Sequence, residues 1–414
     1  MDNYSIKNIR KQFPILSRKI NSHKFIYLDN AATVHKPIDV INTLQNFYIK
    51  NYATVHRGSY DLSINMTNNI EYIRKQIAKF INAPSSKEII FTKSTTEGIN
   101  FIANTWALQN IKYKHNIIIS EMEHHSNILP WQILSKKIGF TIKIIPLTFN
   151  GELNISKLYK LIDQNTKLIS LTYISNVLGT INPIKKIIAL ARKKNIITLI
   201  DGAQAIANIN INIQDLNCDF FVFSGHKIFG PTGIGVLWGK KEILESISPW
   251  EFGGGMIKYF NKFQDPIWEQ VPWKFEAGTP NISGIIGLSA ALKWFKSFDI
   301  NKIITYNKFL TKYTLEKLNT IPNIKIFGSN KLNNRIGIIS FNINQHHAYD
   351  IGSFLDQYGI AIRTGHHCAI PVMNYYNVQS MCRISLSIYN NIEEIDVFIE
   401  KLIYINNLLL NKKL

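Results

Sequence analysis

Seven short apolar runs, rich in Ile and Val, alternate with longer amphipathic stretches between residues 88 and 239. These runs are EIIF, NIIIS, TIKIIPL, KLISLTYI, ITLID, FFVFS and GIGVLW. Strands that are apolar on both faces are typical of a mostly parallel sheet covered by helices on both sides. The pattern therefore predicts an α/β domain built on a seven-stranded sheet. Only a few residues rich in Gly and Pro connect the last two runs, which allows one antiparallel strand there.

The pattern changes after the helix predicted over ISGIIGLSAALKWFKSF. A strand (RIGIISFNI), a helix (AYDIGSFLDQYG), a strand (CRISLSIY) and a last helix through Leu410 follow. This order predicts a smaller α+β domain. We expect a large domain over residues 20–295 and a smaller one formed by residues 1–19 and 296–414. Asn390 and Glu393 have the spacing of a capping box at the start of the last helix.

Composition limits the classes of function. The 414 residues carry a formal net charge of +19, but the lysines are scattered through every segment, so we do not predict nucleic-acid binding. No apolar run approaches the ~18 residues of a membrane span, and the N-terminus lacks the apolar core of a secretion signal. Three cysteines without a CxxC spacing indicate neither a disulfide framework nor a zinc site. We therefore expect a cytoplasmic protein.

Polar residues follow the predicted strands, and ligands of open α/β sheets bind outside the carboxyl ends of the strands. After EIIF, the segment STTEGIN places hydroxyls at the first turn of a helix, whose backbone N–H groups can hold a phosphate. Ser94 and Glu97 have the spacing of a capping box, so an ordinary N-cap is the alternative. Asp201 ends the buried run ITLID, and a carboxylate there needs a cation or a strong donor.

Lys227 follows the run FFVF in the segment FSGHKIFG. A desolvated lysine has a lowered pKa and becomes a usable nucleophile, although a lone strand-end lysine is more often a surface group. A reactive amine, a buried carboxylate and a phosphate cradle are together the three features that pyridoxal phosphate requires. His124 and His125 are adjacent and do not share a helix face, so we predict no metal site; a ring lying over a flat cofactor is as plausible.

The segments FSGHKIFGPTGIG, LIDGAQA, STTEGIN, SEMEHHSN and RTGHHCA resemble motifs of the class V aminotransferase-like family of fold-type I pyridoxal-phosphate enzymes, and specifically its cysteine desulfurases of the SufS type. The similarity runs from IYLDNAAT to the last helix. It implies that Lys227 binds the cofactor covalently and that Asp201 faces the pyridine nitrogen. The other contacts that it implies are Gln204 at the ring hydroxyl, His124 stacked on the ring, Asn176 near the substrate or the ring hydroxyl, and Thr95, Thr96, Ser224 and His226 at the phosphate. Thr279 matches a threonine that completes the phosphate site of the partner subunit, which implies a homodimer.

One cysteine has the setting of a reactive thiol. Cys368 follows a glycine and two histidines in a predicted loop that begins at Arg363, and positive neighbours favour the thiolate. Cys218 and Cys382 lie in or next to apolar strands and fit a structural role. Arg383 opens an apolar strand and resembles the arginine that binds the substrate carboxylate, a bidentate task.

The resemblance implies that the chain removes sulfur from L-cysteine, with Lys227 as base and Cys368 as nucleophile, giving L-alanine and a persulfide on Cys368. His124 is a candidate acid or base for the substrate thiol. The short segment before Pro371 resembles the group that passes sulfur to an acceptor similar to SufE, for iron–sulfur cluster assembly. Selenocysteine lyase is the nearest alternative. A class V aminotransferase and a non-enzymatic nucleic-acid-binding protein are more distant ones.

Overall fold

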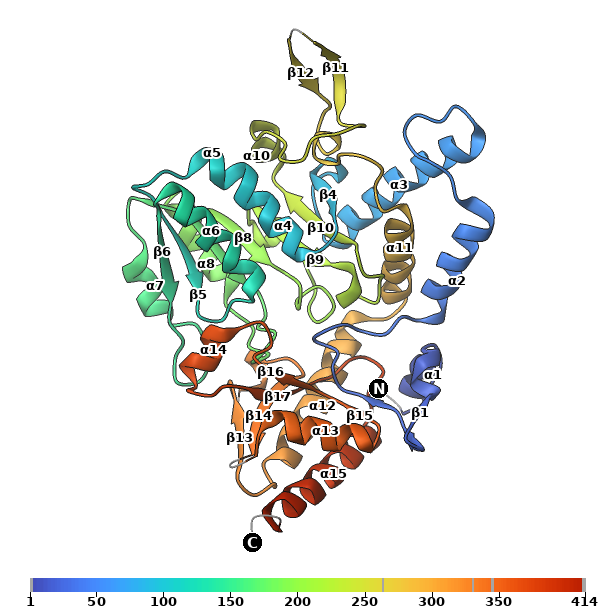
Figure 1. Cartoon of the computed structure of the whole chain (residues 1–414), viewed down its shortest axis with the longest axis vertical. Coiled ribbons are helices and arrows are strands. Elements are labelled where there is room, and N and C mark those ends of the chain that lie inside the picture. The colour runs from blue at the N-terminus through green and yellow to red at the C-terminus, as the bar shows by residue number, and fades with distance from the viewer. Residues whose placement is uncertain (1–2, 263, 330, 344–345, 412–414) are drawn as a thin grey trace.

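The computed structural model describes residues 3–262, 264–329, 331–343 and 346–411. Its centre is a seven-stranded sheet in the order β4-β10-β9-β8-β7-β5-β6 (Figure 1). The strands are β4 (Ile89–Thr92), β5 (Asn116–Ser120), β6 (Thr141–Ile145), β7 (Thr166–Thr172), β8 (Ile197–Asp201), β9 (Phe220–Ser224) and β10 (Gly235–Gly239). β10 pairs antiparallel with β4 and β9, whereas β5 to β9 pair in parallel. The predicted mostly parallel sheet is confirmed, including its antiparallel strand.

Both faces of this sheet are buried because successive side chains of each strand enter different cores. Phe221 and Phe223 of β9 pack in one core, and Phe220 and Val222 pack in the other. The first core is closed mainly by α3 (Asp61–Phe80), α8 (Ile184–Lys193) and α11 (Ile282–Lys296). The second is closed by α4 (Thr95–Ile102), α6 (Leu129–Ile138) and α10 (Lys241–Ser246). The doubly apolar runs of the sequence therefore have their physical cause in two helical layers.

The first turn of α4 lies close to the end of the sheet. A Cβ atom added at Gly98 would come within 2.8 Å of Val222 Cγ1, so only glycine allows this approach of helix to strand. Ser94 caps the helix by accepting from Glu97 N at 3.3 Å, but the Glu97 carboxylate accepts from Lys93 N rather than from Ser94 N. Half of the predicted capping box is thus present. The helix start points its backbone N–H groups over the strand ends.

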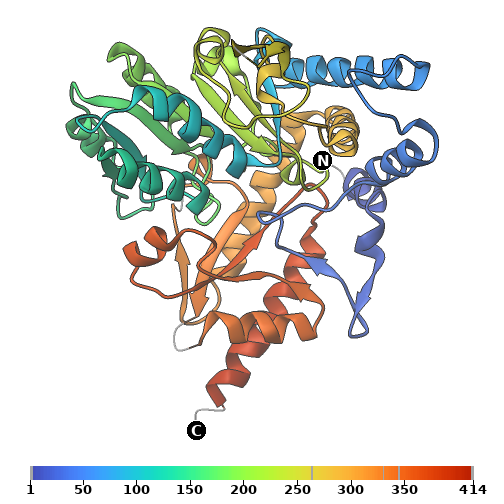
Figure 2. The same cartoon turned by 45° about the horizontal axis from the view of Figure 1, so that its top comes forward.

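The C-terminal part forms a second, antiparallel sheet in the order β13-β14-β17-β16 (Figure 2). Its strands are β13 (Ile324–Phe327), β14 (Ile338–Ile343), β16 (Arg363–Gly365) and β17 (Met381–Ser385). Its helices are α12 (Ile300–Leu318), α13 (Ala348–Gln357), α14 (Ile370–Tyr375) and α15 (Ile392–Asn411). Its core of Leu, Ile and Phe residues is separate from the two cores of the large sheet. The capping box of α15 is formed by Asn391 and Glu394, one residue later than the sequence indicated.

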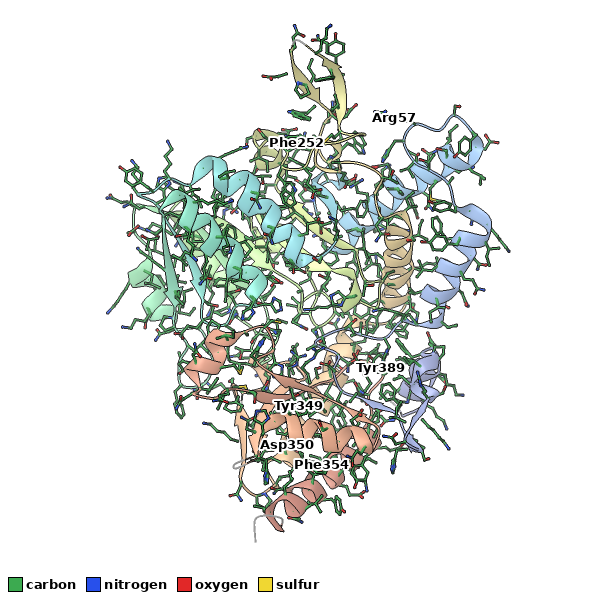
Figure 3. The ribbon with its side chains drawn as sticks, viewed as in Figure 1. Arg57, Phe252, Tyr349, Asp350, Phe354 and Tyr389 are labelled. Atoms are coloured by element: carbon green, nitrogen blue, oxygen red, sulfur yellow. The ribbon has the colours of Figure 1, made fainter. Side chains whose placement is uncertain are left out.

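The N-terminal segment is attached to this second sheet. After α1 (Asn3–Lys11) and a short hairpin of β1 (Lys19–Ile20) and β2 (His23–Lys24), β3 (Ile26–Tyr27) pairs in parallel with β15 (Ile360–Ala361). The Asn30 side chain donates to the carbonyl oxygen of Ser385 at 2.6 Å. Tyr389, labelled in Figure 3, is fully buried and packs 4.6 Å from the ring of Phe13. The segment of residues 26–30 therefore packs against residues 360–389, next to the carboxyl ends of the strands of the large sheet.

A hairpin of β11 (Ile257–Asn261) and β12 (Gln264–Trp268) projects at the top of Figure 1, away from the second sheet. Phe252, 70% exposed, lies near its base in Figure 3, with its ring 5.8 Å from that of Trp268. The remaining helices are α2 (Ile38–Asn46), α5 (Leu108–Asn110), α7 (Ile155–Leu161) and α9 (Ile213–Leu216). Among the described residues, no helix combines the length and the apolar character needed to span a membrane.

Candidate active site

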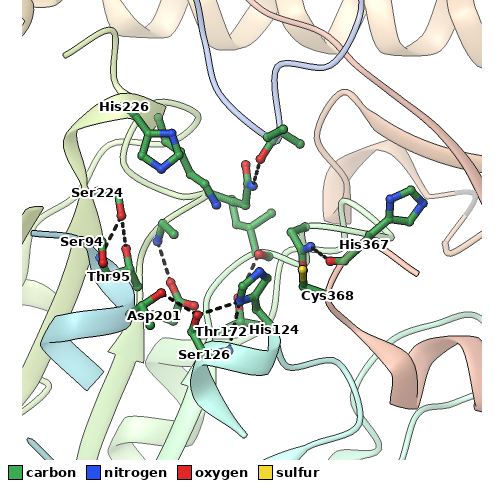
Figure 4. A pocket seen from close by; sticks show the side chains of 18 of the residues that line it. Ser94, Thr95, His124, Ser126, Thr172, Asp201, Ser224, His226, His367 and Cys368 are labelled. Carbon is green, nitrogen blue, oxygen red and sulfur yellow. Dashed lines mark hydrogen bonds between the residues drawn. The ribbon is translucent and has the colours of Figure 1, made fainter. Parts of the chain in front are cut away.

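A cavity of about 230 Å³ opens between the carboxyl ends of the large sheet and the second sheet (Figure 4). All the predicted site residues except Thr279 line it. They come from the start of α4 and from the segments after β5, β7, β8 and β9, while β16, β17 and the loop between them complete the wall: Thr95, Thr96, His124, Asn176, Asp201, Gln204, Ser224, His226, Lys227, Cys368 and Arg383. The residues that follow the apolar runs thus meet in space, as expected for parallel strands.

Lys227 and Asp201 form the charged base of the cavity. Asp201 is 4% exposed, and its Oδ1 accepts from Ala203 N at 2.8 Å. Burial raises the pKa of this carboxyl, while the Ala203 hydrogen bond and the charge of Lys227 act against that rise. Burial lowers the pKa of Lys227, opposed by Asp201 and reinforced by Arg383. Among the described residues, no hydrogen bond or ion pair engages Lys227 Nζ, so this amine is available for chemistry.

Hydroxyl and backbone groups gather at the start of α4. Ser224 Oγ accepts from Thr95 N and contacts Thr95 Oγ1, both at 2.8 Å. Thr96 Oγ1 lies 2.7 Å from Ser126 Oγ. His226 Nδ1 is buried with no hydrogen-bond partner among the described residues, and burial, Lys227 and Lys36 lower the pKa of its ring to about 4. These groups form a neutral donor set at a helix N-terminus, which suits an anion such as a phosphate.

His124 lies beside this set, and Figure 4 shows it close to Ser126. Its Nδ1 accepts from the backbone N–H of Ser126 at 3.1 Å. Burial and then the charge of Lys227 lower the pKa of His124 to about 3, so its ring is neutral at pH 7. Because Nδ1 is an acceptor, the proton of the neutral ring is assigned to Nε2. His124 therefore offers the cavity a flat ring with one N–H donor.

Two arginines share one carboxylate that the sequence reasoning did not identify. Asp29, in the segment IYLDNAAT, accepts from Arg383 Nη2 at 2.9 Å and from Arg363 Nε at 2.9 Å. Arg383 is 3% exposed, its Nη1 donates to the Asn176 carbonyl oxygen, and its Nε has no partner among the described residues. The pairing of β3 with β15 and the bridge of Asp29 to Ser385 at the end of β17 bring Asp29 here, and no local signal reveals these contacts.

Gln204 and Asn176 each use their amide group within the wall of the cavity. Gln204 Nε2 donates to the Ala31 carbonyl oxygen at 2.7 Å, and Asn176 Nδ2 donates to the carbonyl oxygen of His367 at 2.8 Å. Asn176 thereby contacts the loop that carries Cys368. Cys368 itself is exposed, whereas Cys218 and Cys382 are buried, so the chain has one accessible thiol among its three.

Thr279 does not reach this cavity within one chain. It is exposed and lines a different cavity of about 300 Å³, together with Phe91, Lys93, Glu97 and Trp250. This placement leaves open its predicted role at the site of a partner subunit. Among the described residues, no group of three or more His, Cys, Asp or Glu side chains is arranged to hold a metal ion.

Comparisons with known proteins agree on one family. The family model described as aminotransferase class-V matches residues 26–398. A cysteine desulfurase of Salmonella dublin is 49% identical over 98% of this chain and 99% of its own length. A solved cysteine desulfurase of Thermococcus onnurineus NA1 has a TM-score of 0.92 and 34% identity, covering 97% of this chain and 98% of that one. The solved cysteine desulfurase CsdA of Escherichia coli has a TM-score of 0.88 and 34% identity, covering 96% and 97%.

Proposed function

The chain belongs to the aminotransferase class-V family and is a cysteine desulfurase, and from this premise we propose that its cavity binds L-cysteine, releases L-alanine and retains the sulfur as a persulfide on Cys368. The enzyme is then a sulfurtransferase. The observation that supports these roles is the meeting, in one cavity, of the unpaired Lys227 amine, the buried Asp201 carboxylate and the exposed Cys368 thiol. A protein that only binds a ligand would not need a free lysine amine beside a buried carboxylate and an exposed thiol in the same cavity.

The residues of the cavity fit pyridoxal 5'-phosphate, the cofactor that this family implies. Lys227 would bind its aldehyde carbon, Asp201 would face its pyridine nitrogen, and His124 would lie on its ring. When bound, the cofactor supplies an electron-withdrawing ring that takes up electrons released at the substrate α-carbon. The other proposed contacts are Gln204 and Asn176 at the ring hydroxyl, and Thr95, Thr96, Ser224, His226 and the partner's Thr279 at the phosphate.

Lys227 and His124 are the proposed proton carriers. Because burial lowers the pKa of Lys227, its amine loses its proton at a lower pH than the amine of an ordinary lysine does. It can then accept the α-proton of the substrate. His124 carries its proton on Nε2, on the ring edge turned away from its contact with Ser126 N. We propose that this N–H hydrogen-bonds to the substrate sulfur and gives it a proton, while Nδ1 takes up a proton in return from Ser126 Oγ, 3.0 Å away.

Cys368 is the proposed nucleophile. Its thiolate attacks the sulfur of the substrate, so that a bond forms between the two sulfur atoms while the substrate bond between Cβ and sulfur breaks. The electron pair of the broken bond stays with the three-carbon fragment, which takes up a proton at Cβ and leaves as L-alanine. The sulfur atom remains on Cys368 as a persulfide, and no external oxidant or reductant is required.

Arg383 is proposed to bind the carboxylate of L-cysteine, because a buried guanidinium holds a carboxylate more firmly than an exposed one. Two of its nitrogens are occupied by Asp29 and by the Asn176 carbonyl oxygen, while Nε has no partner in the described part of the chain. Arg363 also pairs with Asp29, and its side chain is 48% exposed. It lines the mouth of the cavity and adds positive charge there. Asp29 thus orients both cations before the substrate arrives.

The fate of the persulfide is proposed from the shape of its loop. Only Ala369 and Ile370 separate Cys368 from Pro371 in α14, so the loop is short and the sulfur cannot travel far. We therefore infer a SufS-type enzyme that hands sulfur to a SufE-like acceptor in the cytoplasm, for iron–sulfur cluster assembly. A homodimer is part of this proposal, since Thr279 of one chain would complete the phosphate site of the other.

L-selenocysteine is a proposed second substrate, since a selenol is a better leaving group and depends less on attack by a thiolate. A class V aminotransferase activity is less favoured, because it has no use for a cysteine in a loop with His366 and His367. The relatives that match over their full length carry the name of desulfurases, which also disfavours it.

The proposal is tested by incubating the purified holoenzyme and its Cys368→Ala variant with L-cysteine and a reductant, while alanine, sulfide and the visible spectrum are recorded. The wild type should release equal amounts of alanine and sulfide, and the variant should change its spectrum with L-cysteine but release at least ~100-fold less alanine. Substitution of the buried Cys218 by Ala is the matched control. Turnover of L-cysteine by neither protein would disprove the proposal, and equal turnover by both would remove Cys368 from it.

A further inference from the structure

One histidine of the large sheet holds the loop that carries Cys368. His125 lies in η5 (His125–Asn127), just after β5, and its backbone N–H donates to the Cys368 carbonyl oxygen at 2.7 Å. Its ring Nε2 accepts from the backbone N–H of Ile370 at 3.2 Å. One residue therefore binds the loop both at the nucleophile and two positions beyond it.

The backbone of this loop requires such support. His367 and Cys368 have φ values of +51° and +54°, in the left-handed region that residues with a Cβ rarely adopt. A residue with a Cβ is strained in this region, so it keeps the conformation only when its surroundings hold it in place. The buried ring of His367 hydrogen-bonds to the Met381 carbonyl oxygen, but the Cys368 side chain is exposed and packs little. Contacts of its backbone must therefore fix its position: its carbonyl oxygen accepts from His125 N, and its N–H donates to His366 Nδ1 at 3.1 Å.

The ring of His125 can accept the Ile370 hydrogen bond only while its Nε2 carries no proton. The titratable groups near this ring are the rings of His124 at 6.3 Å and His366 at 5.6 Å. Lys137 of α6 lines the same groove, and Cys368 adjoins His125 through their backbone hydrogen bond. From α4 and η4 (Ala103–Ala107), the groove that His125 lines presents neutral side chains, Thr96, Asn100 and Asn104. Burial and His366 lower the pKa of His125, so the accepting form prevails at neutral pH.

We propose that His125 is a positioning residue for sulfur transfer. Its neutral ring keeps Cys368 in the left-handed conformation in which the thiolate meets the substrate sulfur, and its protonation releases the loop. This inference rests on the proposed function, and it deepens that function by naming what places the nucleophile. His125 acts through the loop backbone and touches no reacting atom.

The test compares two variants of the full-length holoenzyme. His125→Gln keeps an acceptor oxygen near the position of Nε2 but does not titrate, whereas His125→Leu keeps the bulk and removes the acceptor. His347→Gln is the matched control, because the ring of His347 also accepts a backbone N–H, from Tyr349 at 3.3 Å, but does so at the start of α13. The readouts are the single-turnover rate of persulfide formation, the spectral change with L-cysteine, and hydrogen–deuterium exchange of residues 366–375 between pH 5 and pH 7.

His125→Leu should slow persulfide formation by ~10–100-fold with an unchanged spectral response to L-cysteine, and it should remove exchange protection of the loop at both pH values. His125→Gln should stay within about threefold of the wild type at pH 7 and lose the deprotection that we expect of the wild type as the pH falls from 7 to 5. Wild-type exchange and rate in His125→Leu would overturn the proposal. If that variant does not fold, a His125→Gln protein that retains the wild-type pH dependence overturns it instead. A wild type that forms no persulfide refutes the proposed function, while the exchange measurement still decides the role of His125.

Discussion

Two parts of the proposed site differ in how they are held in place. The cavity floor is formed by Asp201, Ser224 and Lys227, and the Cys368 loop by residues 366–370. The floor residues lie at or just after the ends of buried strands, where the sheet fixes them and burial shifts the pKa values of Asp201 and Lys227. The loop has an exposed cysteine on a left-handed backbone, held by a few hydrogen bonds to neighbouring residues. A group that must tune a proton benefits from a rigid, water-poor place. A sulfur atom that must be handed to another molecule needs access, and so its position depends on a small number of contacts.

The largest effect should come from the floor. Lys227→Ala removes both the proposed covalent anchor of the cofactor and the base, so the rate of alanine formation should fall by at least ~10³-fold. The exposed Lys185→Ala, which breaks only a surface ion pair with Asp215, is the control and should keep full activity. Steady-state alanine assays on cofactor-supplemented protein measure both. Activity of Lys227→Ala within tenfold of the wild type would contradict the role of the floor.

A smaller effect should separate the two arginines that share Asp29. Arg383→Lys loses the fork of the buried guanidinium, so KM for L-cysteine should rise by ~10–100-fold with little change in kcat. Arg363→Lys, at the exposed mouth, should raise KM by less than about threefold. Equal effects of the two substitutions, measured by alanine formation against L-cysteine concentration, would show that burial does not set the strength of carboxylate binding here.

His124, which lines the same cavity beside the floor, should make the protein sensitive to acid. The pKa of His124 is about 3 in the folded chain and about 6.5 when unfolded, so the unfolded state binds more protons below pH 6.5. Stability is therefore lost as the pH falls from 6.5 towards 3, and His124 alone lowers the free energy of unfolding by about 2 kcal/mol between pH 7 and pH 5. Urea unfolding should show this difference shrinking by about that amount in His124→Asn. His56→Asn, which removes an exposed histidine, is the control, and it should keep the wild-type difference in unfolding free energy between pH 7 and pH 5. An unchanged difference in His124→Asn would refute the assignment.

The smallest effect should be the difference in stability between replacing a buried cysteine and replacing the exposed one. Cys382 is fully buried in β17, with its Sγ 3.4 Å from the Ala348 carbonyl oxygen. Its replacement by Ala should lower the free energy of unfolding of the protein by about 1 kcal/mol. Cys368→Ala should change it by less than about 0.5 kcal/mol, since the side chain is exposed. Equal losses in denaturant unfolding would mean that the Cys368 loop is packed like the core.

The sequence predicted what depends on local order and not what depends on distant contacts. The seven runs became β4 to β10. Asp201, Ser224 and Lys227 meet because Asp201 ends β8, Ser224 ends the neighbouring β9, and Lys227 follows three residues later. Asp29 was missed as the partner of the two arginines, since its position follows from β3 pairing with β15 far along the chain. His125 was noticed only as half of a histidine pair, because its bonds to Cys368 and Ile370 arise from packing of one sheet against the other.

The pairing of β3 with the C-terminal part has a consequence for the order in which the protein is made. Asn30, beside Asp29, is separated by 355 residues from Ser385, whose carbonyl oxygen it binds. At a synthesis rate of about 5–20 residues per second, the ribosome needs roughly 20–70 s to supply that partner. The large sheet can form during this interval, but the arginine that would bind the substrate carboxylate meets Asp29 only after residue 383 has been synthesised. A nascent chain that ends before Arg383 therefore has every floor residue and still no finished site.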